Sequence, residues 1–214
     1  MSTATGPSTA ATGPISTSST TTSTTSRALR VDAQRNRDAL LEAAAAAFTD
    51  HGTDASLEDV ARRAGVGIGT LYRHFPTRDA LVEAAYRRGV ETICDQADEL
   101  HAAEQPAAAL EHWMLTFVGY VATKRGLAGT LKLASDTHTE LFAYVHGRMR
   151  ASMTMLVDAA VESGQIRADA DSADLLRAIG GVCMVSDQPD WQDQSRRLVR
   201  LLMDGLRYGA PMAS

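Results

Sequence analysis

The chain has 214 residues with a formal net charge of −5, enough for one medium-sized or two small domains. Its 44% of hydrophobic and 22% of charged residues are typical of a globular protein, and no apolar run approaches the roughly 20 residues of a membrane span. Aromatic residues make up only 5%, which with abundant alanine favours packed helices and argues against a β-sandwich.

The charge is unevenly distributed along the chain. Residues 1–26 carry no charge, residues 27–88 have a net charge of +1, and residues 89–214 have a net charge of −6. Because DNA repels acidic surfaces, we expect any nucleic-acid partner to bind within residues 27–88.

The compartment follows from the cysteines and the N-terminus. Cys94 and Cys183 offer neither a disulfide framework nor a CxxC metal motif, and we expect two reduced thiols. No basic segment followed by an apolar stretch opens the chain, so we expect no signal peptide and a cytoplasmic protein without membrane contact.

The N-terminal segment is rich in hydroxyl side chains. Residues 1–26 contain 17 Ser or Thr and two Gly-Pro pairs, without apolar periodicity. Such a segment buries too little to offset its ordering entropy, so we predict a disordered tail over residues 1–29. A DNA-binding arm would need more basic residues, which favours a solvated tail.

A helix-turn-helix follows. Apolar residues spaced three and four apart predict a helix over 36–51. Ser56, with an acid three residues later, is a good N-cap for a short second helix. After the turn at 65–67, a third helix is expected over about 68–74, until Pro76 breaks it. Two short helices around a glycine-containing turn are typical of DNA-binding proteins.

The rest of the chain keeps the helical period. Thr77 is a good N-cap for a helix over 77–103. Apolar stripes predict further helices from 106, over 126–134, from 142 to 164, around 175–183 and over 191–208. No strand-like alternation is present, so the sequence predicts an all-α fold, with an N-terminal helix-turn-helix domain over 30–82 and a helical domain over 83–214.

The segment 35–82 resembles the TetR/AcrR family of bacterial regulators. Its run AGVGIGTLYRHFPTRDAL, at 64–81, is highly specific for that family. The further matching residues are Leu40, Ala43, Ala44, Phe48, Gly52, Leu57, Val60 and Ala61. Beyond this segment the chain matches the family only in helical pattern and length.

The third helix has the chemistry of a recognition helix. An α-helix fits the major groove, and Gly67 and Gly69 at its leading end allow the backbone to approach DNA closely. Thr70 and Tyr72 offer hydroxyls, and Arg73 offers a forked donor for guanine or phosphate. Gly67 departs from the family, in which a polar residue is common there.

The resemblance assigns DNA contacts residue by residue. It implies phosphate contacts by Thr70, Tyr72 and His74, and base contacts by Ile68, Gly69 and Arg73. Helix starts bind phosphates through their free N–H groups, which adds as candidates Arg35, Arg37, Ser56, Thr77 and Arg78. Some of these side chains could equally be plain surface or core residues.

The resemblance also implies a dimer. The last two helices would pair with those of a second copy, so that two recognition helices reach half-sites about 34 Å apart on a palindromic operator. The candidate interface residues are Leu175, Ile179, Leu198, Leu201, Leu202 and Gly205. The alternative is that both stripes pack inside their own chain.

A small apolar or amphipathic effector is expected in the second domain. The candidate pocket residues combine aromatic rings with adaptable methionines. They are Trp113, Phe117, Tyr120, Leu131, Phe142, Met149, Met153 and Met184, each of which could also be ordinary core.

The sequence therefore predicts a ligand-responsive repressor that binds duplex DNA as a homodimer. A ligand would act by its different affinity for two states of the dimer, with residues 77–103 as the lever. The alternatives are an effector-independent DNA-binding protein or an activator. We expect no enzyme, since GxSxG, phosphate-loop, HExxH and dinucleotide motifs are absent, and no metal or other cofactor, since His112, His138 and His146 lack metal spacing.

Overall fold

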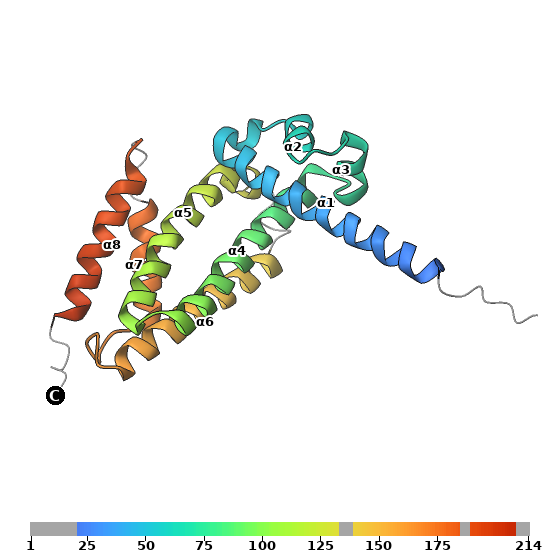
Figure 1. Cartoon of the computed structure of the whole chain (residues 1–214). Helices are drawn as coiled ribbons and strands as arrows, with labels where there is room; N and C mark the ends of the chain where they lie inside the picture. The colour runs from blue at the N-terminus through green and yellow to red at the C-terminus, as the bar shows by residue number, and fades with distance from the viewer. Residues whose placement is uncertain (1–20, 133–138, 185–188, 209–214) are drawn as a thin grey trace, which may run out of the picture. The chain divides into compact units, whose positions relative to one another are not determined.

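The structure is a computed structural model that describes residues 21–132, 139–184 and 189–208. The chain divides into two compact units, residues 1–36 and residues 37–214. In the described segments every regular element is a helix, eight of them α-helices and one a 3-10 helix (Figure 1). The predicted all-α class is therefore confirmed.

The helices have the following bounds. The N-terminal half contains α1 (Thr21–His51), η1 (Gly52–Asp54), α2 (Leu57–Arg63), α3 (Ile68–His74) and α4 (Arg78–Ala103). The C-terminal half contains α5 (Pro106–Lys132), α6 (Thr139–Glu162), α7 (Ser172–Met184) and α8 (Trp191–Arg207). None of these helices is long and apolar enough to cross a membrane.

Two helices extend further than expected. α1 begins at Thr21, so residues 21–29 are helical where the sequence predicted a disordered tail. No proline lies between Thr21 and the apolar part of α1, and a helix that has nucleated there can propagate through hydroxyl residues at small cost. Residues 1–20 of the predicted tail lie outside the described residues.

The second extension concerns α5. It runs without a break to Lys132, so the separate short helix expected from Gly126 is wrong. A glycine inside a helix costs about 1 kcal/mol but keeps its backbone hydrogen bond, and therefore weakens the helix without ending it.

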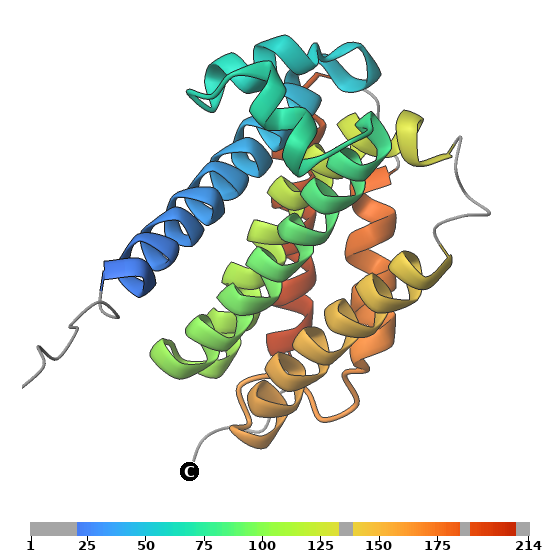
Figure 2. The same ribbon diagram turned by 90° about the vertical axis from the view of Figure 1, so that its right-hand side faces the viewer.

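The long helices pack around α5. Within the second unit α4 packs on α5 and α6, α6 packs on α7, and α5 also contacts α7, α8 and η1. Figure 2 shows α4, in green, running beside the yellow-green α5. The 3-10 helix η1 thus links the helix-turn-helix directly to α5, in addition to the covalent link through α4.

Aromatic rings form a continuous chain through this core. Trp113 is fully buried, and its indole Nε1 donates to the carbonyl oxygen of Ile93 at 2.9 Å. Ring centroids are 5.9 Å apart for Trp113 and Phe117, 5.8 Å for Phe117 and Tyr120, and 6.4 Å for Tyr120 and Tyr86. Aromatic pairs at such spacings stabilise beyond their buried area, so α4 and α5 are held firmly together.

The loop between α6 and α7 fastens two helix ends. Gly164 has φ of 69°, a conformation that glycine adopts without strain. Gln165 accepts a hydrogen bond from Ala107 N at 2.9 Å, and the backbone N–H of Arg167 donates to Leu206 O at 2.9 Å. The start of α5 and the end of α8 are therefore fixed by the same loop.

We predict that Trp113→Ala lowers the free energy of unfolding by about 3–5 kcal/mol, because it leaves a large cavity in the core. Urea denaturation followed by far-UV circular dichroism, at one protein concentration, measures the change. Val31→Ala, at a side chain 42% exposed on α1, is the control and should stay within about 0.5 kcal/mol of the unchanged chain. A small effect of Trp113→Ala would contradict the packing described.

Candidate nucleic-acid interface

Short-range hydrogen bonds define the helix-turn-helix. Ser56 caps α2, since its hydroxyl oxygen accepts a hydrogen bond from Asp59 N at 3.3 Å. The hydroxyl also donates to Glu58 Oε2 at 2.9 Å. Gly65 has φ of 69°, which turns the chain between α2 and α3. Ser56 therefore has a local structural role in addition to any contact with DNA.

α3 has one buried and one exposed side. Leu71 and Phe75 are buried in the core. On the exposed side Ile68 and Tyr72, one turn apart, are 37% and 47% exposed, large values for apolar or aromatic side chains. A methyl group added at Gly69 would meet no atom within 4 Å. The exposed side of α3 is thus free of covering atoms of the described residues.

The arginines of α2 and α3 differ in their partners. Arg62 and Arg63 both form ion pairs with Asp59, and Arg63 also pairs with Asp50 at 3.0 Å. The hydrogen bond from Arg62 is the largest cause that lowers the pKa of Asp59. Arg73 is exposed and forms no ion pair with any described residue. Arg73 can therefore reach an external anion without first breaking an ion pair.

The N-terminus of α4 lies just beyond α3. Thr77 caps it, accepting a hydrogen bond from Ala80 N at 3.1 Å. Arg78 differs from the expectation of a DNA contact. Its guanidinium donates to Ala55 O at 2.8 Å and lies 5.4 Å from the ring centre of Phe48. This side chain joins α4 to α1 and to the segment before α2, so its main role in the structure is internal.

Three further candidates have different surroundings. The guanidinium of Arg37 lies 5.1 Å from the ring centre of Phe75, the residue that ends α3. Arg35 belongs to the first compact unit, where it pairs with Asp32 at 3.7 Å. His74 is half-buried, and its Nε2 is buried without a hydrogen-bond partner among the described residues. Of the three, His74 is the least accessible as a phosphate ligand.

The predicted effector residues differ in their burial. Trp113, Phe117, Met149 and Met153 are buried in the core, and Phe142 is half-buried. Met184 was expected in the pocket, but it is 51% exposed at the end of α7. The side chain of Leu131 lies outside the described residues. Helical periodicity identifies the apolar side of a helix, but it does not distinguish close-packed core from the wall of a cavity.

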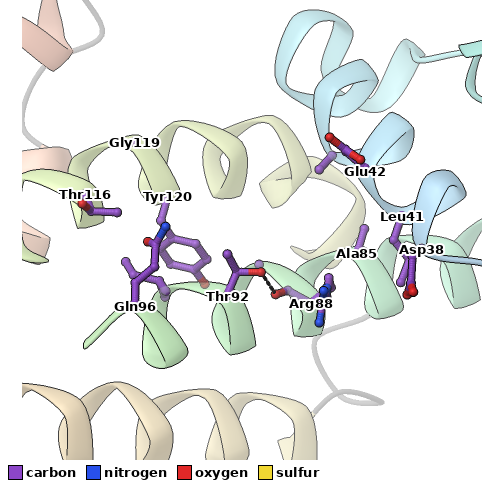
Figure 3. Close-up of a pocket in the computed structure, with 13 residues that line it drawn as sticks. Asp38, Leu41, Glu42, Ala85, Arg88, Thr92, Gln96, Thr116, Gly119 and Tyr120 are labelled. Atoms are coloured by element: carbon purple, nitrogen blue, oxygen red, sulfur yellow. Dashed lines mark hydrogen bonds between the residues drawn. The ribbon is translucent and has the colours of Figure 1, made fainter. Parts of the chain in front are cut away.

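A cavity with a volume of about 550 Å³ lies between α1, α4 and α5 (Figure 3). Tyr120 is the predicted pocket residue that lines it. Burial raises the pKa of Tyr120 well above its ordinary value, so this phenol stays neutral. The other lining residues are Asp38, Leu41, Glu42, Ala45, Ala85, Arg88, Gly89, Thr92, Ile93, Gln96, Thr116 and Gly119. Sequence reasoning missed this cavity because its walls come from both predicted domains.

The predicted dimer residues fall into two groups. Leu175 and Ile179 on α7 are buried within their own chain, which corrects their assignment to an exposed interface. An apolar stripe in the sequence shows that one side of the helix is buried, but it does not show whether that side packs within its own chain or against a second copy. Leu198 and Leu201 on α8 are 46% and 66% exposed, Leu202 is half-buried and Gly205 is exposed. These four residues remain candidates for an interface, and the exposed Met184 lies on the neighbouring helix.

Comparison with known proteins matches both the N-terminal and the C-terminal part of the chain to transcriptional regulators. Residues 40–85 match the family model described as bacterial regulatory proteins, tetR family. Residues 105–208 match the model described as transcriptional regulator SbtR-like, C-terminal domain. A curated relative, the HTH-type transcriptional repressor KstR2 of Mycobacterium tuberculosis, is 29% identical over 73% of this chain and 83% of its own length.

Solved structures agree. A TetR transcriptional regulator from Streptomyces coelicolor is 42% identical, with a TM-score of 0.75, covering 83% of this chain and 99% of its own. A TetR transcription regulatory protein from Mycobacterium vanbaalenii is 37% identical, with a TM-score of 0.70, covering 84% of this chain and 99% of its own. The chain therefore belongs to the TetR family of DNA-binding transcriptional regulators and is not an enzyme.

Proposed function

We propose that this chain is a ligand-responsive repressor that binds a palindromic operator as a homodimer and leaves it when a small effector binds. Residues 30–82 form the DNA-binding domain in this proposal, and residues 83–214 form the effector-binding and dimerisation domain. The observation that carries the proposal is the uncovered side of α3, where Ile68 and Tyr72 are exposed and Arg73 forms no ion pair with the residues that the structure describes.

The chemistry of that side suits the major groove. The glycine at 69 permits close approach of the backbone, and Ile68 offers an apolar contact for a thymine methyl group. Arg73 supplies a forked donor for guanine, while Thr70 and Tyr72 supply hydroxyls for phosphates. The caps Ser56 and Thr77 mark two helix N-termini where further phosphates can bind backbone N–H groups.

Repression is favoured over activation by a relative. The Mycobacterium tuberculosis protein that matches most of the chain is named a transcriptional repressor. A ligand-responsive regulator is favoured over an effector-independent one by the cavity of about 550 Å³, which is within the roughly 300–1,000 Å³ of small-molecule sites.

The dimer is supported by one outward side of α7 and α8. Leu198 and Leu201 lie exposed on α8, and Met184 lies exposed on α7. The exposed glycines Gly181 and Gly205 have open space where a side chain would be. In a twofold dimer this surface would pack against its own copy and form a four-helix interface, and the small residues would let the helices approach closely.

Two connections can carry a signal between effector and DNA. α4 runs without a break from Arg78, just after α3, to Ala103, and η1 packs on α5. An effector that binds more tightly to one separation of the two DNA-binding domains would shift the dimer toward that separation. By linkage, the operator would weaken effector binding by the same factor.

Substitution of Arg73 and of Arg78 distinguishes a DNA contact from a structural role. Arg73→Ala should weaken binding to duplexes that the protein itself selects from a random library by about tenfold or more, because a base or phosphate contact is lost. It should leave stability unchanged. Arg78→Ala should instead lower the free energy of unfolding by about 1–3 kcal/mol, since it removes the hydrogen bond to Ala55.

Fluorescence anisotropy of labelled duplexes and urea denaturation give the two measurements. Arg150→Ala, which removes an exposed arginine from α6, is the matched control and should change neither. If Arg73→Ala and Tyr72→Ala both retain full affinity for the selected duplexes, the assignment of α3 to the groove is wrong. Failure to select any duplex would refute DNA recognition as such.

A further prediction concerns the dimer. Leu201→Glu places a charge without a partner in the proposed interface, which should cost about 3 kcal/mol or more and give monomers at micromolar concentration. Light scattering coupled to size exclusion measures the mass. Val31→Glu, a matched change at another exposed apolar side chain, should remain dimeric. A Leu201→Glu chain that stays dimeric would exclude this surface as the interface.

A further inference from the structure

The cavity between α1, α4 and α5 joins the two proposed domains. Asp38, Leu41, Glu42 and Ala45 contribute from α1, and the remaining lining residues come from α4 and α5 (Figure 3). In the second domain Trp113 and Phe117 are buried, and their ring centroids are 5.9 Å apart. The cavity between α1, α4 and α5 therefore offers a space for a ligand at the base of the DNA-binding domain.

Two glycines help to keep this space open. On α4, a Cβ added at Gly89 would lie 3.5 Å from the ring of Tyr120. On α5, a Cβ added at Gly119 would meet no atom within 4 Å. A larger side chain at Gly119 would consequently grow into open space without displacing the core. The ring of Tyr120, with Leu41 and Ile93, provides an apolar wall for a ligand.

Charged groups on this cavity carry a net negative charge. Asp38 and Glu42 lie one turn apart on α1, and Arg88 lies on α4. Two carboxylates and one guanidinium leave a formal charge of −1. The side chain of Glu42 makes no hydrogen bond or ion pair with the described residues. The polar lining residues Thr92, Gln96 and Thr116 are uncharged.

We propose that this cavity binds a small amphipathic molecule with an apolar ring system and a single amine, and that it is the site through which such a molecule controls operator binding. The apolar wall would take the ring system and Glu42 would pair with the ammonium group. The regulatory half of this proposal rests on the proposed function, whereas the binding half does not.

The contacts of α1 explain how an occupant would affect DNA binding. Arg37, the neighbour of Asp38, lies over the ring of Phe75 at the end of α3. One end of the recognition helix is thus fixed by a residue adjacent to the cavity wall. A ligand between α1 and α4 changes the distance between these helices, and α3 is attached to both through Arg37 and through the short link to Arg78.

Three fluorescent probes with the same ring system and different charge test the binding half. They are dansylcadaverine, which is cationic, dansylamide, which is neutral, and dansylglycine, which is anionic. Titration into the full chain should give the tightest binding for dansylcadaverine. Glu42→Gln should weaken the binding of dansylcadaverine by about threefold, the effect expected for an exposed charge pair, and should leave the affinity for dansylamide unchanged. Equal affinities for all three probes would overturn the assigned ligand class.

Filling the cavity locates the site. Gly119→Leu should weaken the binding of dansylcadaverine by about tenfold or more, because the new side chain occupies the space that the ligand would fill. Gly147→Leu, at a helical glycine of α6 that also has open space and does not line the cavity, is the matched control and should bind normally. Thr92→Met, at an exposed lining residue, repeats the test if Gly119→Leu melts early in circular dichroism. Unchanged binding in both filling variants would exclude this cavity.

Operator binding in the presence of the probe tests whether the cavity controls DNA binding. Saturating dansylcadaverine should weaken binding to the selected duplexes by about fivefold or more, and Gly119→Leu should abolish that effect. If the duplexes bind normally and the probe changes nothing, control by this cavity is refuted while DNA binding stands. If no duplex binds at all, the proposed function is refuted, and the cavity is still judged by the effect of Gly119→Leu on the probe.

Discussion

Everything at the DNA-binding end depends on the burial of one side of α3. A seven-residue helix is too short to be stable alone, so α3 exists because Leu71 and Phe75 are buried in the core. The same core contains Leu40, Ala44 and Phe48 of α1, all fully buried. Two guanidinium groups complete it, Arg37 over Phe75 and Arg78 over Phe48. The uncovered side of α3 is then presented as a rigid surface, which is what base recognition requires.

The same constraint gives the arginines different roles. An arginine that packs on an aromatic ring and donates to a carbonyl, as Arg78 does, holds the domain together. Arg62 and Arg63 are neutralised by Asp59 and Asp50, which weakens their attraction for phosphates. Arg73, without an ion-pair partner among the described residues, keeps its full charge for an external one. A net charge of −5 is therefore compatible with DNA binding, because the acidic excess lies after residue 88.

The sequence predicts local structure well and spatial neighbours poorly. The N-caps Ser56 and Thr77 and the bounds of α3 follow from short-range chemistry and agree with the structure. The apolar stripe of α7 is also found, but Leu175 and Ile179 turn inward, because periodicity does not name the partner of a stripe. Met184, which the sequence places in the pocket, is 51% exposed at the end of α7. The sequence analysis missed the N-terminal extension of α1. Composition shows that residues 21–29 can bury little apolar surface, but it does not show that a helix formed farther along the chain can extend through them.

In the proposed mechanism, the position of the cavity determines which parts of the structure must move before ligand binding affects the DNA-binding domain. A ligand deep among α5 to α8 would have to move packed aromatic rings before the DNA-binding domain responded, and close-packed interiors resist gradual deformation. A ligand between α1 and α4 touches the two helices to which α3 is attached. Of the aromatic chain from Trp113 to Tyr86, only Tyr120 lines this cavity, so the proposed ligand would touch one of its four rings. In the proposed mechanism, control from the cavity between α1, α4 and α5 therefore requires less rearrangement of the core.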